Sequence, residues 1–139
     1  MRKTLLILII LISSFTAASF AQAVGSASLY LSPPSGTYAV GGTFPVTVKV
    51  NSGGETINAA EGTLIFNPDE ISVESLSKNS SIFPFWVQEP TFSNSTGNIV
   101  FGGGMPNSFV GVSGSVITIT FKVKASASAQ VSFSSGSIL

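Results

Sequence analysis

Acidic side chains are the main candidates for chemistry in this chain, because it contains no histidine and no cysteine. The usual general base and the usual ligands of zinc and copper are therefore missing. Asp69, Glu70 and Glu74 could supply the two carboxyl groups of a glycoside hydrolase, which must face each other across about 5 to 9.5 Å. However, Asp69 and Glu70 are adjacent beside a predicted turn, and no cleft is indicated near them. We therefore predict that the protein is not an enzyme.

Metal and phosphate sites are also weakly supported by the sequence. Asp69 and Glu70 could contribute to a calcium site, which needs six or more converging oxygen atoms, but no Asp-x-Asp-x-Asp loop is present. We expect these residues to cap a turn. The run Gly102–Gly104 lacks the Lys-Ser/Thr pair and the helix of a phosphate-binding loop, so we expect it to break or bulge a strand. The sequence predicts neither a metal ion nor a cofactor.

Two groups of residues could instead bind a partner. Glu61 is predicted to face outward from a strand, where it either accepts a charge-assisted hydrogen bond or remains a solvated carboxylate. Phe83, Phe85 and Trp86 could form an aromatic platform for a polysaccharide, or they could belong to the core. Such a platform usually presents several exposed rings, and this chain has one Trp and two Tyr beside its eleven Phe. We expect these three aromatic residues to lie mainly in the core.

The N-terminus has the three parts of a secretory signal. Arg2 and Lys3 precede an apolar run over residues 5–12, and small residues follow up to Ala21-Gln22-Ala23. We expect cleavage after Ala23, which makes residues 1–23 the signal and residues 24–139 the domain of a secreted or cell-surface protein. The apolar run is too short to span a bilayer. Membrane contact is expected only through this signal or through an anchor beyond residue 139.

Charge after cleavage argues against a nucleic-acid partner. Removal of residues 1–23 leaves four lysines against six acidic residues, a net charge of about −2. No basic patch is available to hold phosphates. Only 9% of all residues are charged, so the surface must consist largely of neutral polar groups. Such a surface is typical of a secreted binding module.

These candidates must be positioned by β-strands. In the stretch 59–73, Ala60, Leu64 and Phe66 share one face, and Asn67-Pro68-Asp69 ends the strand. The segment 77–90 is predicted to be a short strand or a packed crossover. The other predicted strands cover residues 26–31, 37–40, 44–50, 71–74, 91–93, 98–101, 114–124 and 130–133.

The fold class follows from this alternation. No window of helical length outside residues 1–23 has apolar residues spaced by three and four, so we predict an all-β antiparallel sandwich. Pro45 places part of its strand at a sheet edge, and the length of 114–124 favours a central strand. The residues 94–97 form a hairpin signal. Because nothing follows Leu139, we expect the last strand of the sandwich to be missing.

Four stretches, taken in order, resemble the cohesin domain that receives a dockerin module in cellulosome scaffoldins. These are the turn and strand of residues 40–46, the strand, turn and strand of residues 62–73, the strand of residues 98–101 and the long strand of residues 114–124. The resemblance covers about residues 26–139. Its most specific part is the Asn67-Pro68-Asp69 turn, which is similar to the Tyr-Asp-Pro type turn of the family.

The resemblance implies a nine-stranded jelly-roll sandwich without catalytic activity that binds an extracellular, dockerin-bearing protein through one sheet face. Partner-binding positions fall on Ala59, Glu61 and Thr63, and further along on Gly102 and Met105. Glu61 keeps an acidic group, whereas Ala59 lacks a hydrogen-bonding side chain. Gly102 and Met105 stand where the family often has larger or acidic contact residues.

Two other functions are compatible with the same sandwich. Cellulose-binding modules have a similar fold, so the chain could bind a polysaccharide. It could also be a structural or adhesive domain of a cell-surface protein, as cohesin-like domains also occur in secreted proteins unrelated to cellulose breakdown.

Overall fold

The computed structural model describes residues 25–139, and within them all regular structure is β-strand. The predicted signal over residues 1–23 lies outside the described residues. No helix in residues 25–139 is long and apolar enough to cross a bilayer. The strands are β1 (Ser28–Ser32), β2 (Thr43–Asn51), β3 (Ile57–Phe66), β4 (Ile71–Ser77), β5 (Phe85–Ser93), β6 (Asn98–Phe109), β7 (Gly114–Val123) and β8 (Val131–Ile138).

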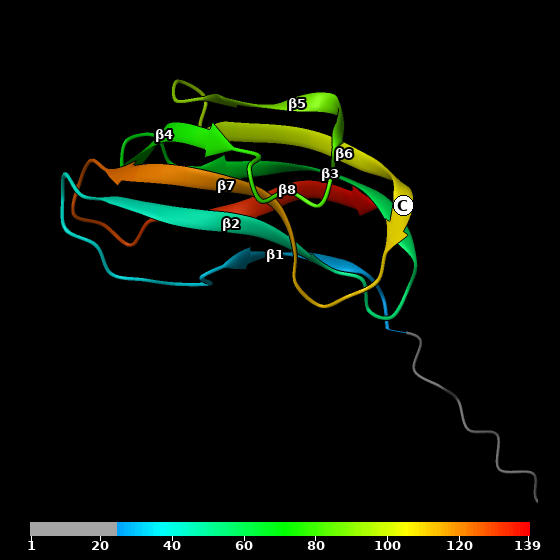
Figure 1. Cartoon of the computed structure of the whole chain (residues 1–139). Helices are drawn as coiled ribbons and strands as arrows, with labels where there is room; N and C mark the ends of the chain where they lie inside the picture. Colours follow the sequence, from blue (N-terminus) through cyan, green and yellow to red (C-terminus); the bar gives the residue numbers. More distant parts are fainter. Residues whose placement is uncertain (1–24) are drawn as a thin grey trace, which may run out of the picture.

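The strands form two four-stranded sheets that face each other (Figure 1). One sheet has the order β1-β2-β7-β4 and the other has the order β5-β6-β3-β8, and all neighbours are antiparallel. The predicted all-β antiparallel sandwich is confirmed, with eight strands among the described residues where about nine were expected. The central position predicted for residues 114–124 is also confirmed, because β7 lies between β2 and β4.

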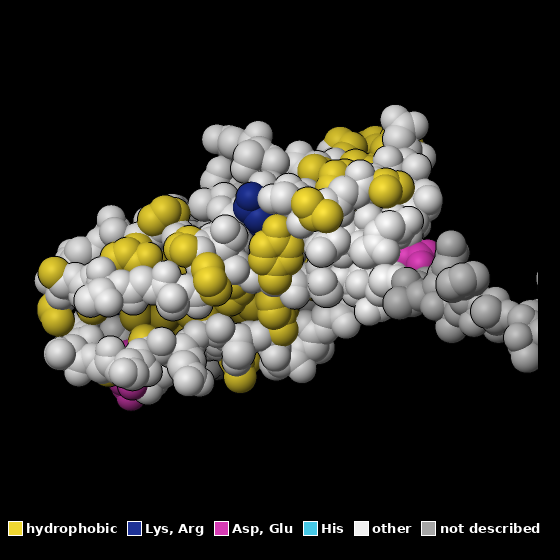
Figure 2. All heavy atoms as spheres, turned by 90° about the horizontal axis from the view of Figure 1, so that it is seen from below, with side chains coloured by type: hydrophobic (Ala, Val, Ile, Leu, Met, Phe, Trp, Pro, Cys, Tyr) yellow, Lys and Arg dark blue, Asp and Glu magenta, His cyan; other side chains and the backbone are white. Residues whose placement is uncertain are grey.

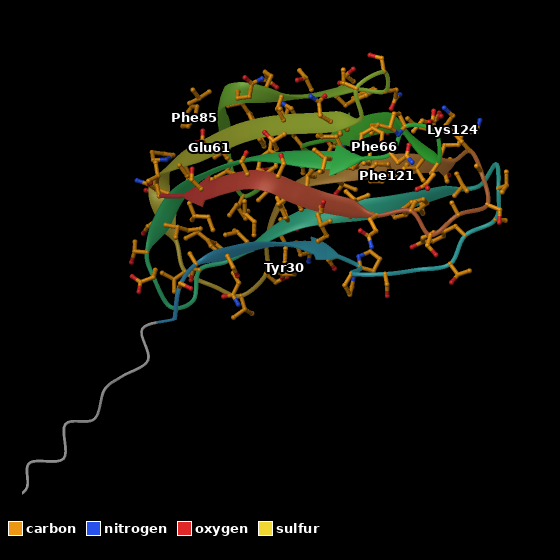
Figure 3. The ribbon with its side chains drawn as sticks, turned by 180° about the vertical axis from the view of Figure 1, so that it is seen from behind. Tyr30, Glu61, Phe66, Phe85, Phe121 and Lys124 are labelled. Carbon is orange, nitrogen blue, oxygen red and sulfur yellow. The ribbon has the colours of Figure 1, made fainter. Side chains whose placement is uncertain are left out.

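The core lies between the sheets and is built from alternate residues of each strand. In β3, Ala60, Leu64 and Phe66 are buried, as their spacing predicts. In β7, which belongs to the other sheet, Ile119 and Phe121 are completely buried. The rings of Phe66 and Phe121 meet edge to face across the gap, with centroids 5.7 Å apart (Figure 3).

The turn at Asn67-Pro68-Asp69 carries the chain from one sheet to the other. The backbone N–H of Asp69 donates to Asn67 Oδ1 at 3.0 Å, and the N–H groups of Glu70 and Ile71 donate to the Asn67 carbonyl. Lys124 Nζ donates to the Pro68 carbonyl at 2.7 Å. The predicted turn is therefore present, and Asp69 and Glu70 belong to it as expected. The strands that it joins, β3 and β4, lie in different sheets.

Pro45 lies where β2 has a neighbour on one side only. β1 pairs with β2 from Thr47 to Asn51, so Pro45 pairs only with Thr120 of β7. This confirms the predicted edge position. On the side of Pro45 away from β7 no strand is present to accept a hydrogen bond, so the missing proline N–H costs no interstrand hydrogen bond there.

The glycine run Gly102–Gly104 does not end a strand, so the expected break is absent. The bulge expected as its alternative is supported, because the pairing register shifts between Trp86 and Gln88, opposite these glycines, and again just beyond Gly104. β6 continues through it for twelve residues, from Asn98 to Phe109. A Cβ atom on Gly103 would lie 2.8 Å from Phe83 Cδ2 and 3.0 Å from Trp86 Cζ3. The glycine is therefore needed for the close approach of these two rings to an extended backbone, rather than for a bend. The adjoining segment 77–90, predicted to be a short strand or a crossover, contains the start of β5.

The edge strands β1 and β8 lie on the same side of the sandwich, where Leu29 of β1 comes close to Gly136 of β8. Figure 2 shows hydrophobic side chains gathered on this side, toward the loops that follow β1 and β7. A hollow there is lined mainly by apolar residues, among them Leu31, Tyr38 and Phe44, and the Tyr38 ring stacks on Phe44 with centroids 4.0 Å apart. This hollow belongs to the end loops and lies away from the predicted binding residues.

The opposite side is closed by Asn94, in the predicted hairpin turn between β5 and β6. Its amide oxygen accepts a hydrogen bond from the Val73 N–H at 2.8 Å, and its Nδ2 donates to the Val73 carbonyl at 3.0 Å. Val73 belongs to β4, the edge strand of the other sheet. The Asn94 side chain therefore pairs with the backbone of β4 as a neighbouring strand would, and these two hydrogen bonds link the two sheets.

We predict that Asn94→Ala lowers the free energy of unfolding by about 1–3 kcal/mol, because two backbone groups of Val73 lose their partner. Asn79→Ala is the matched control, since Asn79 is exposed and its side chain makes no hydrogen bond within residues 25–139. We expect the control to change stability by less than about 0.5 kcal/mol. Urea unfolding followed by circular dichroism measures both. Equal stability of the two variants would contradict a bracing role for Asn94.

Candidate binding face

The outer face of the β5-β6-β3-β8 sheet carries most of the predicted binding residues. Glu61 and Thr63 alternate along β3 with the buried Gly62 and Leu64, and therefore they point away from the core. Figure 3 labels Glu61 and Phe85 on this sheet. The outward orientation predicted for Glu61 is confirmed, because its side chain is exposed.

Four residues form one row across all the strands of this face. Glu61 of β3 lies opposite Gly102 of β6 on one side and Ser137 of β8 on the other. Gly102 in turn lies opposite Gln88 of β5. Ser137 Oγ donates a hydrogen bond to Glu61 Oε1 at 3.0 Å. Across the sheet, the row therefore consists of the Ser137 hydroxyl, the Glu61 carboxylate, Gly102 without a side chain, and the Gln88 amide.

The gap in the row is the floor of a shallow hollow. Gly102 faces outward but is buried beneath its neighbours. A Cβ atom on Gly102 would lie 3.1 Å from Gln88 Cβ and 3.5 Å from Glu61 Cβ, so its absence leaves the space between these two side chains unfilled. The hollow is lined by Glu61, Gly62, Thr63, Gln88, Val100, Phe101, Ser135, Gly136 and Ser137.

An apolar contact lies in the next row of the same face. Ala59 pairs with Gly104, and Gly104 pairs with Phe85 of β5. The two small residues leave the Phe85 ring uncovered, and 61% of this residue is exposed. From the sequence, Phe85 was a candidate only together with Phe83 and Trp86, as part of an aromatic platform or of the core.

The aromatic platform itself is not formed. Phe83 is only 2% exposed and belongs to the core, and Trp86 packs edge to face against it with ring centroids 6.4 Å apart. Phe85 is the exposed member of the three. The preference for a core position was right for Phe83 and Trp86 and wrong for Phe85.

Four of the five predicted binding residues, Ala59, Glu61, Thr63 and Gly102, lie together on this face. Met105 instead packs against the hydrophobic core, because β6 keeps its alternation through the glycines and puts Met105 on the same side as Gly103. We leave Met105 out of the candidate face.

The sequence missed Gln88 and Ser137, which complete the row. Their place follows from strand register, and β5 and β8 each contain a register shift. No motif at these positions could have revealed which residue lies opposite Glu61. Only the order of the strands in the sheet could show it.

Charge is unevenly distributed over the two sheets. Lys49 and Lys122 lie on strands of the β1-β2-β7-β4 sheet, and Lys78 forms a salt bridge with Glu89 at 2.6 Å. Glu61 makes no salt bridge within residues 25–139. Those residues also contain no group of three or more Asp or Glu that could hold a metal ion. Glu61 is therefore a carboxylate of this face that no lysine of residues 25–139 neutralises.

A comparison with protein families gives a match to the cohesin domain over residues 30–139, most of the chain. The chain belongs to the cohesin family. Among curated proteins, no sequence matches it.

Solved structures show the same fold. The sixth cohesin of scaffoldin B from Acetivibrio cellulolyticus, solved in complex with a mutant Cel5 dockerin, is 18% identical, with a TM-score of 0.62 and coverage of 81% of this chain and 85% of that one. A cohesin module of a family 33 glycoside hydrolase from Clostridium perfringens is 12% identical, with a TM-score of 0.63 and coverage of 83% and 82%. A type I cohesin from Clostridium thermocellum, solved in complex with a dockerin, is 14% identical, with a TM-score of 0.57 and coverage of 71% and 73%.

Cohesin modules are non-catalytic domains that bind other proteins. This cohesin is accordingly a protein–protein interaction module and not an enzyme, as its sequence predicts. The family assignment leaves open which of its residues contact a partner. The geometry of the β5-β6-β3-β8 face is therefore used below to propose which residues contact a partner.

We predict that substitutions at two adjacent residues of β3 differ in their effect on stability. Glu61→Gln is expected to change the free energy of unfolding by less than about 0.5 kcal/mol, because the side chain is exposed. Gly62→Ala is expected to lower it by about 1–3 kcal/mol, because the new Cβ would lie 2.9 Å from the buried Phe101 ring. Thermal or urea unfolding measures both.

Gly104→Ala is the control for the glycine substitution. The nearest atom to its new Cβ would be the Asn58 carbonyl oxygen at 3.4 Å, an ordinary contact. We expect this variant to be as stable as the wild type. If Gly62→Ala has the same free energy of unfolding as Gly104→Ala, the close packing between Gly62 and Phe101 is disproved.

Proposed function

We propose that this cohesin is an exported module that binds a dockerin-bearing extracellular protein through the outer face of the β5-β6-β3-β8 sheet. The observation that carries the proposal is the distribution of exposed apolar side chains. Within the strands, every exposed large hydrophobic residue belongs to this sheet: Ile65, Phe85, Val87 and Phe92. On the outer face itself, Phe85 and Ile65 lie at opposite ends of the sheet, and the rows of Glu61 and Thr63 lie between them. Phe92 pairs with the buried Ile99 and therefore lies toward the inner side of the edge strand β5. Exposed apolar side chains beside polar groups are typical of a protein interface.

The other sheet presents a different surface. Several of its polar side chains bond to one another or to nearby loops, as Thr47 does with Thr118 at 3.1 Å and Lys49 with Ser113 at 2.9 Å. Polar groups that are already paired in this way gain little from a partner. This contrast supports the β5-β6-β3-β8 face as the binding side.

The choice of a dockerin as partner is supported by the family. Two of the similar cohesins described above were solved in complexes with dockerins. The N-terminal pattern of Arg2 and Lys3, an apolar run and Ala21-Gln22-Ala23 supports an extracellular setting.

The binding face is tested by calorimetric titration of residues 24–139 with the dockerin modules of extracellular proteins from the same genome. Thr63→Arg is expected to weaken binding by at least about tenfold, because a long charged side chain would occupy the centre of the face. Thr120→Arg is the matched control, since Thr120 is equally half-buried and points outward from the central strand of the other sheet.

The control is expected to bind like the wild type. Loss of binding in Thr120→Arg together with full binding by Thr63→Arg would place the partner on the other sheet. If the wild type binds none of the dockerins, the proposed partner class is wrong.

Export is tested separately, by expressing the full chain in a bacterial host and measuring the N-terminus of the secreted product by mass spectrometry. We predict a mature chain that begins at Val24. Ala23→Arg is expected to leave the precursor uncleaved, because the cleavage site requires a small residue. Recovery of only uncleaved wild-type chain would contradict the signal.

A further inference from the structure

The carboxylate of Glu61 retains free hydrogen-bonding capacity at the centre of the binding face. An ionised carboxylate can accept about four hydrogen bonds. Within residues 25–139, Glu61 receives one from a side chain, that of Ser137, and no lysine lies within salt-bridge distance. A partner that covers this group must replace the water around it.

Gln88 lines the same hollow and lies on the far side of Gly102 from Glu61. The Gln88 Nε2 donates to the Glu89 carbonyl at 3.0 Å, and the amide oxygen of Gln88 receives no hydrogen bond from residues 25–139. Gly102 separates the two side chains and leaves room for an additional group between them. The hollow is therefore flanked by two acceptors, one of them negatively charged.

From this arrangement we propose that the partner places a lysine or arginine side chain across Gly102, with its cationic group at the Glu61 carboxylate and a second N–H directed to Gln88. This inference rests on the proposed function. A cation with several N–H donors satisfies both acceptors at once. Its aliphatic stem fits the floor formed by Gly102 and the neighbouring Val100.

The hollow also selects against partners that lack this cation. The side chains around Glu61 that line the hollow are neutral, among them Thr63, Ser135 and Ser137, so no cation within residues 25–139 balances the carboxylate once water is removed. Covering an unpaired charge is strongly unfavourable. Glu61 is therefore a specificity-determining residue as well as a contact.

The inference is tested with a dockerin that binds the wild type, by calorimetric titration at low and high salt. Glu61→Gln is expected to weaken binding about tenfold to a hundredfold and to reduce its salt dependence. Glu74→Gln makes the same change of charge at an exposed position on β4 of the other sheet and is expected to leave affinity unchanged.

A charge exchange identifies the partner's residue. Glu61→Lys is expected to abolish binding, and replacement of one lysine or arginine of the dockerin by glutamate is expected to restore it. Gly102→Val is expected to block binding by filling the hollow, with thermal unfolding as the check that it folds. If Gly102→Val does not fold, the Glu61 variants still decide the question.

The outcomes separate this inference from the proposed function. If Glu61→Gln binds as tightly as the wild type with the same salt dependence, while Thr63→Arg does not bind, the face is correct and the cation is wrong. If the Glu61→Lys variant is rescued by no basic-to-acidic substitution in the dockerin, the cation is also wrong. If no dockerin binds the wild type, both proposals are overturned.

Discussion

The burial of alternate side chains between two sheets is the constraint on which the rest of this structure depends. Leu64 and Phe121, one from each sheet, are completely buried, and Phe66 meets Phe121 across the gap. Because an extended strand has only two faces, burying Ala60, Leu64 and Phe66 forces the residues between them outward. The position of Glu61 on the outer face is thus a consequence of the core. A shift of register by one residue would bury its carboxylate.

Glycine shapes both faces of the same sheet. Gly103 points inward and lets the rings of Phe83 and Trp86 approach the backbone of β6, whereas Gly102 points outward and leaves the hollow beside Glu61. In both cases the missing Cβ provides space, and the backbone stays extended. Packing in the core and the shape of the binding face are therefore coupled through consecutive residues of one strand.

The low charge of the chain gives its few ionised groups more influence on recognition. Residues 24–139 contain four lysines and six acidic residues. Lys49 and Lys122 lie on the β1-β2-β7-β4 sheet, and Lys78 forms a salt bridge with Glu89. A single carboxylate surrounded by neutral polar groups can then orient a partner without competition from nearby charges. Its effect increases when the partner removes water, because the local dielectric constant falls.

Much of the fold could be predicted from the sequence, because side-chain alternation and turn chemistry are local properties. The alternation in residues 59–66, the Asn67-Pro68-Asp69 turn, the edge position of Pro45 and the central position of β7 all appear in the structure. At Gly102–Gly104 the expected break is absent and only the register shifts expected of a bulge are found, because glycine is equally compatible with a bend and with a close approach of side chains.

By itself, the sequence determined which residues of β3 point outward, and its resemblance to cohesins predicts a binding role for that strand. Only the tertiary structure decided that Gln88 and Ser137 lie in one row with Glu61, that Phe85 is uncovered beside Gly104, and that Met105 belongs to the core. These facts depend on strand order and register. Both arise from contacts between segments far apart in the chain, which no local pattern of residues records.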